Sequence, residues 1–172
     1  NHPAIIGWCP FNETWDQTSQ AAHRILRAVY DETKRLDPTR PVIDVSGAYH
    51  EITDIYDQHD YDQNPESFGK SYTGYNGEEK SFNLFFKDKQ VYIPQLPFFL
   101  SEFGGIKWIP ESNRSSAADN SWGYGDAPAT EEEFFTRYEG LTAALLNAPN
   151  IMGFCYTQLY DVEQEVNGLY TY

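Results

Sequence analysis

The sequence predicts an α/β fold with a parallel sheet. Short apolar runs end in polar or charged residues, helical patterns separate them, and long polar loops follow. The run at residues 5–9 leads to Asn12-Glu13, and the run at residues 98–101 leads to Glu102. Continuous apolar runs of this kind are typical of strands buried on both faces. Side chains at the carboxyl ends of parallel strands carry the chemistry of such folds, so we expect both glutamates in a site.

The first predicted element is a buried strand within residues 4–15, and its Trp8 side chain is expected to pack in the core. A helix is predicted over residues 18–36, because apolar side chains recur at helical spacing before Asp37-Pro38 ends it. Its buried stripe comprises Ala22, Ile25, Leu26, Val29, Tyr30, Thr33 and Leu36. A strand and turn are predicted at residues 41–47. A weaker strand, which carries charges, is predicted at residues 53–58.

The second half of the chain alternates loops with regular elements. Residues 64–90 are polar and aperiodic, which favours a functional loop with at most a helix inside it. Residues 107–129 form a second predicted loop. A helix begins at Thr130, because Thr130 and Glu133 make a capping box, and the last strand is predicted at residues 151–157.

Composition bounds what the chain can be. Its 172 residues suit one domain, with about five strands, whereas a complete (β/α)₈ barrel needs about 250 residues. The formal net charge of −14 disfavours nucleic acid as a partner, and no apolar run is long enough for a membrane span.

Cys9 and Cys155 lie in apolar runs, where they are expected to pack as small hydrophobes. The cellular compartment is left open. The opening Asn1-His2-Pro3 suggests a piece of something longer.

Three motifs resemble those of family 2 glycoside hydrolases, which include β-galactosidases, β-glucuronidases and β-mannosidases. Residues 1–8 leading to Asn12-Glu13 resemble the fourth-strand motif, residues 101–105 the seventh-strand nucleophile motif, and residues 153–169 the eighth strand and closing segment. The resemblance implies that residues 1–172 are the C-terminal part of a catalytic TIM barrel, about strands 4 to 8. Strands 1 to 3 and the upstream β-sandwich domains would then be absent.

The resemblance implies a retaining β-glycosidase, β-galactosidase-like, that needs no cofactor. Glu13 would be the general acid/base and Glu102 the nucleophile, with their carboxyl groups about 5–5.5 Å apart. Asn12 would bind the sugar 2-hydroxyl. A single glutamate after a strand is usually a solvated or paired carboxylate. Two glutamates inside matching motifs favour catalysis instead.

Four further side chains are predicted to bind the substrate. Tyr61 is the candidate for the family's sixth-strand tyrosine, which donates a hydrogen bond to the nucleophile. His59 is the alternative if the register differs by two residues. Tyr156 stands where many members of the family stack a tryptophan on the sugar, and Trp108 lies in a loop that can line the cleft. Ordinary packing remains the alternative for these aromatic side chains.

Other interpretations remain open. The acidic run Asp57, His59, Asp60 and Asp62 is more typical of a solvated face than of a metal site, so no metal is predicted. The segment alone would be inactive or weakly active. One rival to catalysis is a non-catalytic sugar-binding half-barrel, whose open edges a homodimer would cover. Another is a cellulase-like retaining enzyme of a different family.

Overall fold

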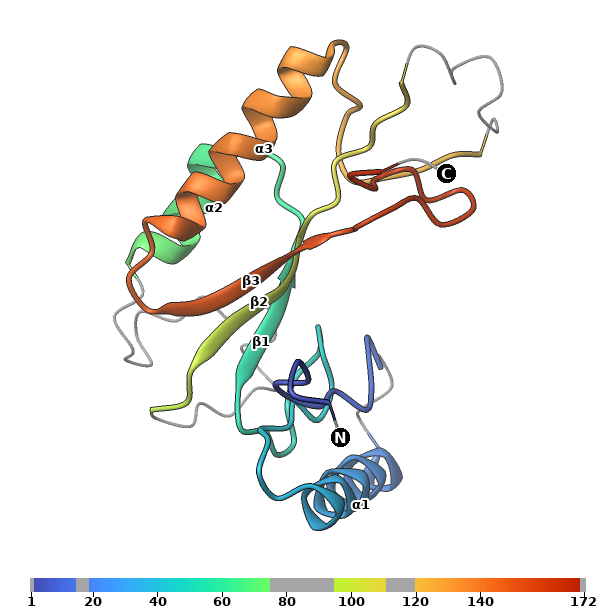
Figure 1. Cartoon of the computed structure of the whole chain (residues 1–172), viewed down its shortest axis with the longest axis vertical. Helices are drawn as coiled ribbons and strands as arrows, with labels where there is room; N and C mark the ends of the chain where they lie inside the picture. The colour runs from blue at the N-terminus through green and yellow to red at the C-terminus, as the bar shows by residue number, and fades with distance from the viewer. Residues whose placement is uncertain (1, 15–18, 75–94, 111–119, 171–172) are drawn as a thin grey trace. The chain divides into compact units, whose positions relative to one another are not determined.

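The computed structural model describes residues 2–14, 19–74, 95–110 and 120–170. Helices and strands alternate in the order α1 (Gln20–Leu36), β1 (Tyr56–Asp60), α2 (Pro65–Thr73), β2 (Phe98–Gly104), α3 (Glu131–Leu146) and β3 (Ile151–Thr157). The three strands form one parallel sheet in the order β1-β2-β3 (Figure 1). The predicted α/β class is therefore confirmed.

The chain divides into two compact units. Unit one comprises residues 1–59, 76–101 and 150–153, and unit two comprises residues 60–75, 102–149 and 154–172. Each strand of the sheet contributes residues to both units. The contacts of each unit are described separately below.

In unit one, α1 confirms the first predicted helix. Ser19 caps its start by accepting a hydrogen bond from the Ala22 amide. Leu26 packs with Val45, Ala48 and Phe11 in the core of this unit. The buried face of α1 is narrower than the predicted stripe. Leu26 and Tyr30 are buried, whereas Ile25 and Leu36 are exposed.

The first predicted strand is not formed as a strand, because isolated bridges stand in its place, and its predicted burial is wrong. Ile6 is 83% exposed, and the indole N–H of Trp8 donates to Asp37 instead of entering the core. Among the described residues, the segment pairs in parallel with residues 41–46 through the isolated bridges Trp8–Val42 and Asn12–Ser46. A strand paired along one edge leaves side chains uncovered. Here they border an apolar hollow of about 410 Å³, lined by Ile6, Gly7, Trp8, Cys9, Pro41, Ile43, Ile55, Phe99 and Met152.

The strand predicted at residues 41–47 is not formed either, and in the described part of the chain this segment appears only as the partner in the two isolated bridges. Every residue from Val42 to His50 is buried. The weaker strand expected at residues 53–58 appears further along, as β1, and all five of its residues are buried despite their charges. The two cysteines, Cys9 and Cys155, were expected to be buried and are exposed instead.

Unit two contains a helix that the sequence prediction left inside a loop. α2 begins after Asn64, whose side chain accepts hydrogen bonds from the amides of Glu66 and Ser67, with Pro65 at the first helical position. α2 packs on α3 (Figure 1). The contact is close, because a Cβ built on Gly140 would lie 2.7 Å from Pro65 Cγ. The rest of the predicted 64–90 loop, after residue 74, lies outside the described residues.

The remaining elements match their predictions. Thr130 caps α3 by accepting a hydrogen bond from the Glu133 amide, as the capping box requires. β2 extends the predicted strand at residues 98–101 to Gly104, and β3 has the predicted bounds. The described parts of the predicted 107–129 loop contain isolated bridges and no helix.

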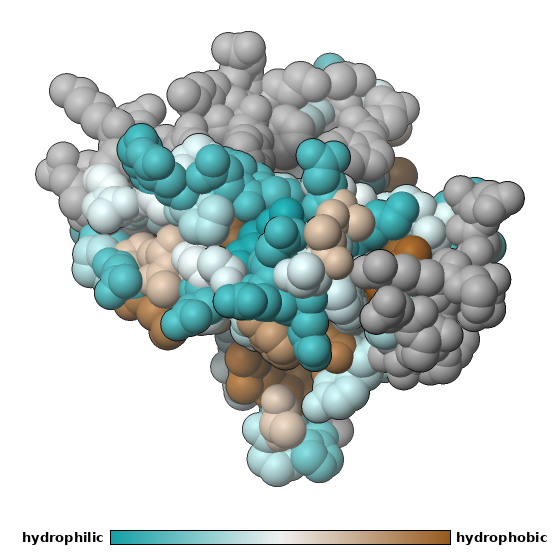
Figure 2. Space-filling view, turned by 90° about the horizontal axis from the view of Figure 1, so that it is seen from above, coloured by the Kyte–Doolittle hydropathy of each residue, from teal (hydrophilic) through white to brown (hydrophobic). Residues whose placement is uncertain are grey.

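Apolar side chains also reach the surface. Figure 2 shows apolar residues, in brown, beside hydrophilic ones on the face it presents. The exposed large apolar residues include Ile6, Met152, Leu159 and Leu169. None of the helices in the described ranges has the length and apolar character needed to cross a membrane.

Candidate functional site

Glu13 lies in unit one, directly after the bridge between Asn12 and Ser46. Its amide donates to the Ser46 carbonyl at 2.8 Å. Its φ of 45° places it in the left-handed region, which costs a non-glycine residue on the order of 1–3 kcal/mol and is common at functional sites. The side chain is 35% exposed. Its carboxylate is therefore held directly after this bridge, with access to solvent.

His59 holds the Glu13 carboxylate. The His59 Nδ1 atom lies 2.9 Å from Glu13 Oε1, and its side chain is buried. Its other nitrogen, Nε2, lies 3.0 Å from Ser46 Oγ. Gly47 makes room for the ring, because a Cβ at that position would lie 2.3 Å from His59. The structure thus places His59, predicted to bind substrate, directly against the predicted acid/base.

A buried polar network continues from Ser46. Ser46 Oγ donates to Asp57 Oδ2 at 2.6 Å, and Ser101 Oγ donates to the same oxygen. The other Asp57 oxygen lies 3.1 Å from His50 Nε2, and His50 Nδ1 lies 2.7 Å from Asp44 Oδ1. Both ion pairs of His50 are fully enclosed. The network therefore joins the surface carboxylate of Glu13 to a charge cluster in the core.

Protonation in this cluster follows from its contacts. Burial alone would lower the pKa of His50, but its hydrogen bonds to Asp44 and Asp57 outweigh burial and raise the pKa to about 9. Burial alone would raise the pKa of Asp57, but hydrogen bonds from His50, Ser101 and Ser46 hold it below its ordinary value. These shifts favour the imidazolium form of His50 and the carboxylate form of Asp57.

Asn12 is exposed beside Glu13 and pairs through its backbone with Ser46. Its side chain is therefore free of the core of unit one, as a sugar-binding amide requires.

Glu102 and Tyr61 meet in unit two. Glu102 lies within β2, and the Tyr61 hydroxyl donates to its carboxylate. Burial and this hydrogen bond raise the pKa of Tyr61, so the phenol keeps its proton. The Tyr61 ring stacks on Tyr124 with ring centroids 3.5 Å apart, and Gly105 is needed there because a Cβ would lie 2.4 Å from Tyr124. This contact is the one that the resemblance predicted for Tyr61.

Tyr156 and Trp108 are half-buried in unit two. The Tyr156 hydroxyl accepts a hydrogen bond from the Ile106 amide at 3.1 Å, and its ring contacts Phe103 and Tyr138. Trp108 packs against Phe134 with centroids 5.7 Å apart. These contacts favour the packing alternative for both rings, and sugar stacking stays a prediction.

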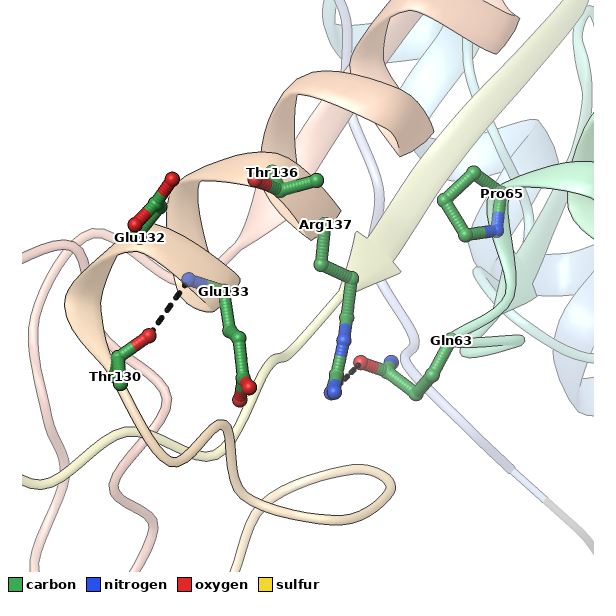
Figure 3. Close-up of a pocket in the computed structure, with 7 residues that line it drawn as sticks. All are labelled: Gln63, Pro65, Thr130, Glu132, Glu133, Thr136 and Arg137. Atoms are coloured by element: carbon green, nitrogen blue, oxygen red, sulfur yellow. Dashed lines mark hydrogen bonds between the residues drawn. The ribbon is translucent and has the colours of Figure 1, made fainter.

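Unit two also carries a polar hollow of about 480 Å³ (Figure 3). It is lined by Gln63, Pro65, Thr130, Glu132, Glu133, Thr136 and Arg137. Arg137 spans it by donating to the Asp126 carbonyl at 2.8 Å and to the Gln63 side chain at 3.4 Å. None of the predicted site residues lines this hollow.

The acidic run at residues 57–62, most of which belongs to β1, is engaged within the protein. Asp60 accepts a hydrogen bond from the Tyr72 hydroxyl at 2.6 Å, and Asp62 accepts one from the Asn64 amide at 2.9 Å. Asp57 belongs to the buried network of unit one. These carboxylates are therefore structural acceptors and not the solvated face that was predicted.

Sequence reasoning missed Asp44, Ser46 and His50, and it assigned Asp57 only to the acidic run. A signal was present. Asp44 and Ser46 interrupt the apolar run of residues 41–47, and Asp57 gives charge to the next strand. Buried charges require partners, so polar residues inside two successive strands indicate a network between them.

Comparison with known proteins agrees with this fold. The family model described as "Glycosyl hydrolases family 2, TIM barrel domain" matches residues 1–104. No curated protein sequence matches the chain.

Several solved structures share the fold. A β-glucuronidase from an uncultured Clostridium sp. matches with a TM-score of 0.66 and 16% identity, over 99% of this chain and 30% of its own. A β-D-glucuronidase from Dictyoglomus thermophilum matches with a TM-score of 0.61 and 19% identity, over 99% and 29%. A β-glucuronidase from Ruminococcus gnavus, solved with an N1-substituted uronic isofagomine, matches with a TM-score of 0.64 and 17% identity, over 99% and 30%.

The chain thus spans under a third of the length of these solved proteins. Its alternating strands and helices are part of a TIM barrel, which confirms the predicted partial barrel. The family model covers more than half of the chain, and the chain belongs to glycoside hydrolase family 2.

Proposed function

We propose that this segment supplies both catalytic carboxylates of a retaining β-glycosidase. The observation that carries the proposal is that two glutamates are each held by a hydrogen-bonding side chain: Glu13, directly after an isolated bridge, by His59, and Glu102, within β2, by Tyr61. Cleavage of a glycosidic bond requires one carboxylic acid and one carboxylate. The Tyr61 hydroxyl donates to Glu102, which suits a carboxylate, and His59 faces Glu13, which suits a group that holds and releases a proton.

Glu102 is the proposed nucleophile. The Tyr61 phenol keeps its proton and donates it to the Glu102 carboxylate, and this hydrogen bond favours the ionised form of Glu102. In the first step the Glu102 carboxylate attacks the anomeric carbon as the bond to the leaving oxygen breaks. The product is a glycosyl ester on Glu102, with the charge of the leaving oxygen cancelled by a proton.

Glu13 is the proposed source of that proton. It protonates the departing oxygen in the first step, and its carboxylate removes a proton from water in the second step. The resulting hydroxide attacks the anomeric carbon and releases Glu102. Double displacement of this kind retains configuration and predicts that the two carboxyl groups lie about 5–5.5 Å apart in the assembled enzyme. Asn12 is the proposed ligand of the 2-hydroxyl.

The proposed substrate is a β-linked neutral sugar of the galactose type. A β-galactosidase-like activity is what the resemblance of residues 101–105 and 153–169 to family 2 motifs implies. The second candidate is a β-glucuronide, which the names of the solved neighbours favour.

The test uses the enzyme that carries this segment. Its kcat/KM is measured on nitrophenyl β-galactoside and nitrophenyl β-glucuronide, and the anomeric configuration of the first-formed product is followed by NMR. Retention of configuration with at least about tenfold preference for the galactoside supports the proposal. Inversion contradicts the mechanism, whereas retention with preference for the glucuronide moves the assignment to the second candidate.

A further inference from the structure

We propose that Ser46 and Asp57 are positioning residues that fix His59 so that one proton is kept between His59 and Glu13. The inference rests on the proposed role of Glu13 as acid/base, and it assigns a function to the buried network behind that residue.

The Asp57 carboxylate sets the direction at Ser46. An ionised carboxylate only accepts hydrogen bonds, and a serine hydroxyl has a single proton. Ser46 Oγ lies 2.6 Å from Asp57 Oδ2, so its proton points at Asp57. His50, held between Asp44 and Asp57, keeps Asp57 ionised. Ser46 can then only accept a hydrogen bond from His59.

This fixes the protonation of the His59 ring. Nε2 lies 3.0 Å from Ser46 Oγ and must carry the proton that Ser46 accepts. A neutral His59 then has a lone pair on Nδ1, which faces Glu13 Oε1 at 2.9 Å. A lone pair facing an ionised carboxylate at that distance is repulsive. The contact is attractive when one proton lies between the two atoms, as protonated Glu13 or as a carboxylate paired with imidazolium.

The retained proton suits both steps of the proposed reaction. In the first step the pair gives one proton to the leaving oxygen, which leaves the Glu13 carboxylate facing the Nδ1 lone pair. In the second step that carboxylate takes a proton from water, and the attractive contact is restored. Among the described residues of unit one, the titratable groups of the network behind Glu13 are Asp57, His50 and Asp44. Partial burial of the thiol and the charge of Asp57 raise the pKa of Cys9, although the residue as a whole is exposed.

The experiment compares matched serine deletions in the enzyme that carries this segment. Ser46→Ala removes the acceptor of Nε2–H and lets the His59 proton move to Nδ1, where it stabilises the Glu13 carboxylate. Ser101→Ala removes the other serine hydroxyl from the same Asp57 oxygen but leaves the Ser46–His59 contact in place. The readout is the pH profile of kcat/KM on an alkyl β-galactoside, whose poor leaving group needs protonation.

We expect Ser46→Ala to move the basic limb of the profile to lower pH by about one unit, and Ser101→Ala to leave it within about 0.3 unit. Asp57→Asn provides a second test, because a neutral amide can donate to Ser46 and reverse the chain, so the same shift is expected. A merely structural role would lower activity at every pH without moving the limb. The same basic limb in Ser46→Ala, Asp57→Asn and wild type would overturn the inference.

A separate variant distinguishes failure of this inference from failure of the proposed function. Glu13→Gln should lower turnover of the alkyl glycoside by about 10²–10⁴-fold. If it does and the basic limb of Ser46→Ala does not move, the positioning role is wrong and the acid/base assignment stands. If Glu13→Gln keeps full activity, the acid/base assignment itself is wrong.

Discussion

His59 Nδ1 lies 2.9 Å from the carboxylate of Glu13, a residue whose backbone occupies the left-handed region directly after the bridge between Asn12 and Ser46. The backbone strain and the buried imidazole together fix where one carboxylate points. Tyr61 does the same for Glu102 in unit two. Each proposed catalytic group therefore has its own hydrogen-bonding partner within its own unit, so each pair can be tested by a separate substitution.

Glu13→Gln should lower turnover by an amount that depends on how much the leaving group needs protonation. For an alkyl glycoside we expect a loss on the order of 10²–10⁴-fold, because the departing oxygen is no longer protonated. For a dinitrophenyl glycoside the first step needs no acid, so the loss should be confined to the second step and an added azide nucleophile should restore turnover. Steady-state rates with both substrates check this, and equal losses on both without azide rescue would contradict the role.

Tyr61→Phe should weaken the nucleophile without removing it. The variant deletes the hydrogen bond that favours the Glu102 carboxylate. We expect kcat/KM to fall about 10- to 100-fold and the acidic limb of its pH profile to move up by about one unit. The Tyr61 ring, which stacks on Tyr124, is kept in this variant. An unchanged acidic limb would show that Tyr61 only packs.

Gly47→Ala should disturb the site more than its small volume suggests. A Cβ at Gly47 would lie 2.3 Å from the His59 ring, and the residue has a φ of 71° that disfavours alanine. We expect a loss of activity of at least about tenfold from displacement of His59. The matched control is Gly74→Ala, because nothing lies within 4 Å of a Cβ there. Equal effects of the two substitutions on kcat/KM would refute the explanation.

The His50 cluster should make stability fall at alkaline pH. The folded-state pKa of His50, about 9, is above its ordinary value of 6.5, so its contribution is complete below about pH 6.5 and is lost as pH rises through 9. A shift of this size corresponds to roughly 3 kcal/mol. The apparent melting temperature of the enzyme should decline as the pH rises through this window. The melting temperature of the His50→Gln variant should be lower at pH 6.5 and should decline less as the pH rises. If the melting temperatures of wild type and His50→Gln change in parallel with pH, the ion-pair account is contradicted.

The segment expressed alone should associate. The hollow lined by Ile6 and Met152 leaves apolar surface that water contacts unfavourably, so we expect a homodimer or larger assembly and little or no turnover. Analytical ultracentrifugation over a range of concentrations checks this. Ile6→Asp is the matched variant, because Ile6 is 83% exposed and its replacement should shift the equilibrium toward monomer. A wild-type monomer at all concentrations would exclude the dimer.

The sequence predicted the elements whose signals are local. α1 and α3 have amphipathic spacing and capping residues, and β2 and β3 are short apolar runs, so all four appear where expected. α2 was missed because it has only nine residues, although Asn64-Pro65 before it is a helix-start signal. The burial of residues 5–9 was wrong, because burial depends on neighbouring strands and not on the apolar run itself.

The site was predicted less completely than the fold. Motifs suggested Glu13 and Glu102, and the Tyr61 contact matches what the resemblance implied. The partnership of His59 with Glu13 joins residues 46 positions apart, and that of Asp44 with His50 depends on a turn. Such contacts are set by how the chain folds between the residues, and spacing in the sequence does not predict them.

The central claim, that Glu102 is the nucleophile of a retaining enzyme, is tested most directly by trapping the glycosyl ester. The enzyme that carries this segment is incubated with a 2-deoxy-2-fluoro-β-galactoside that has an activated leaving group, digested, and mapped by mass spectrometry. The fluorine slows both steps, and the good leaving group lets the ester accumulate. The account predicts one fluorosugar on the peptide that contains Glu102, and none in Glu102→Gln. A label on another residue would contradict the account.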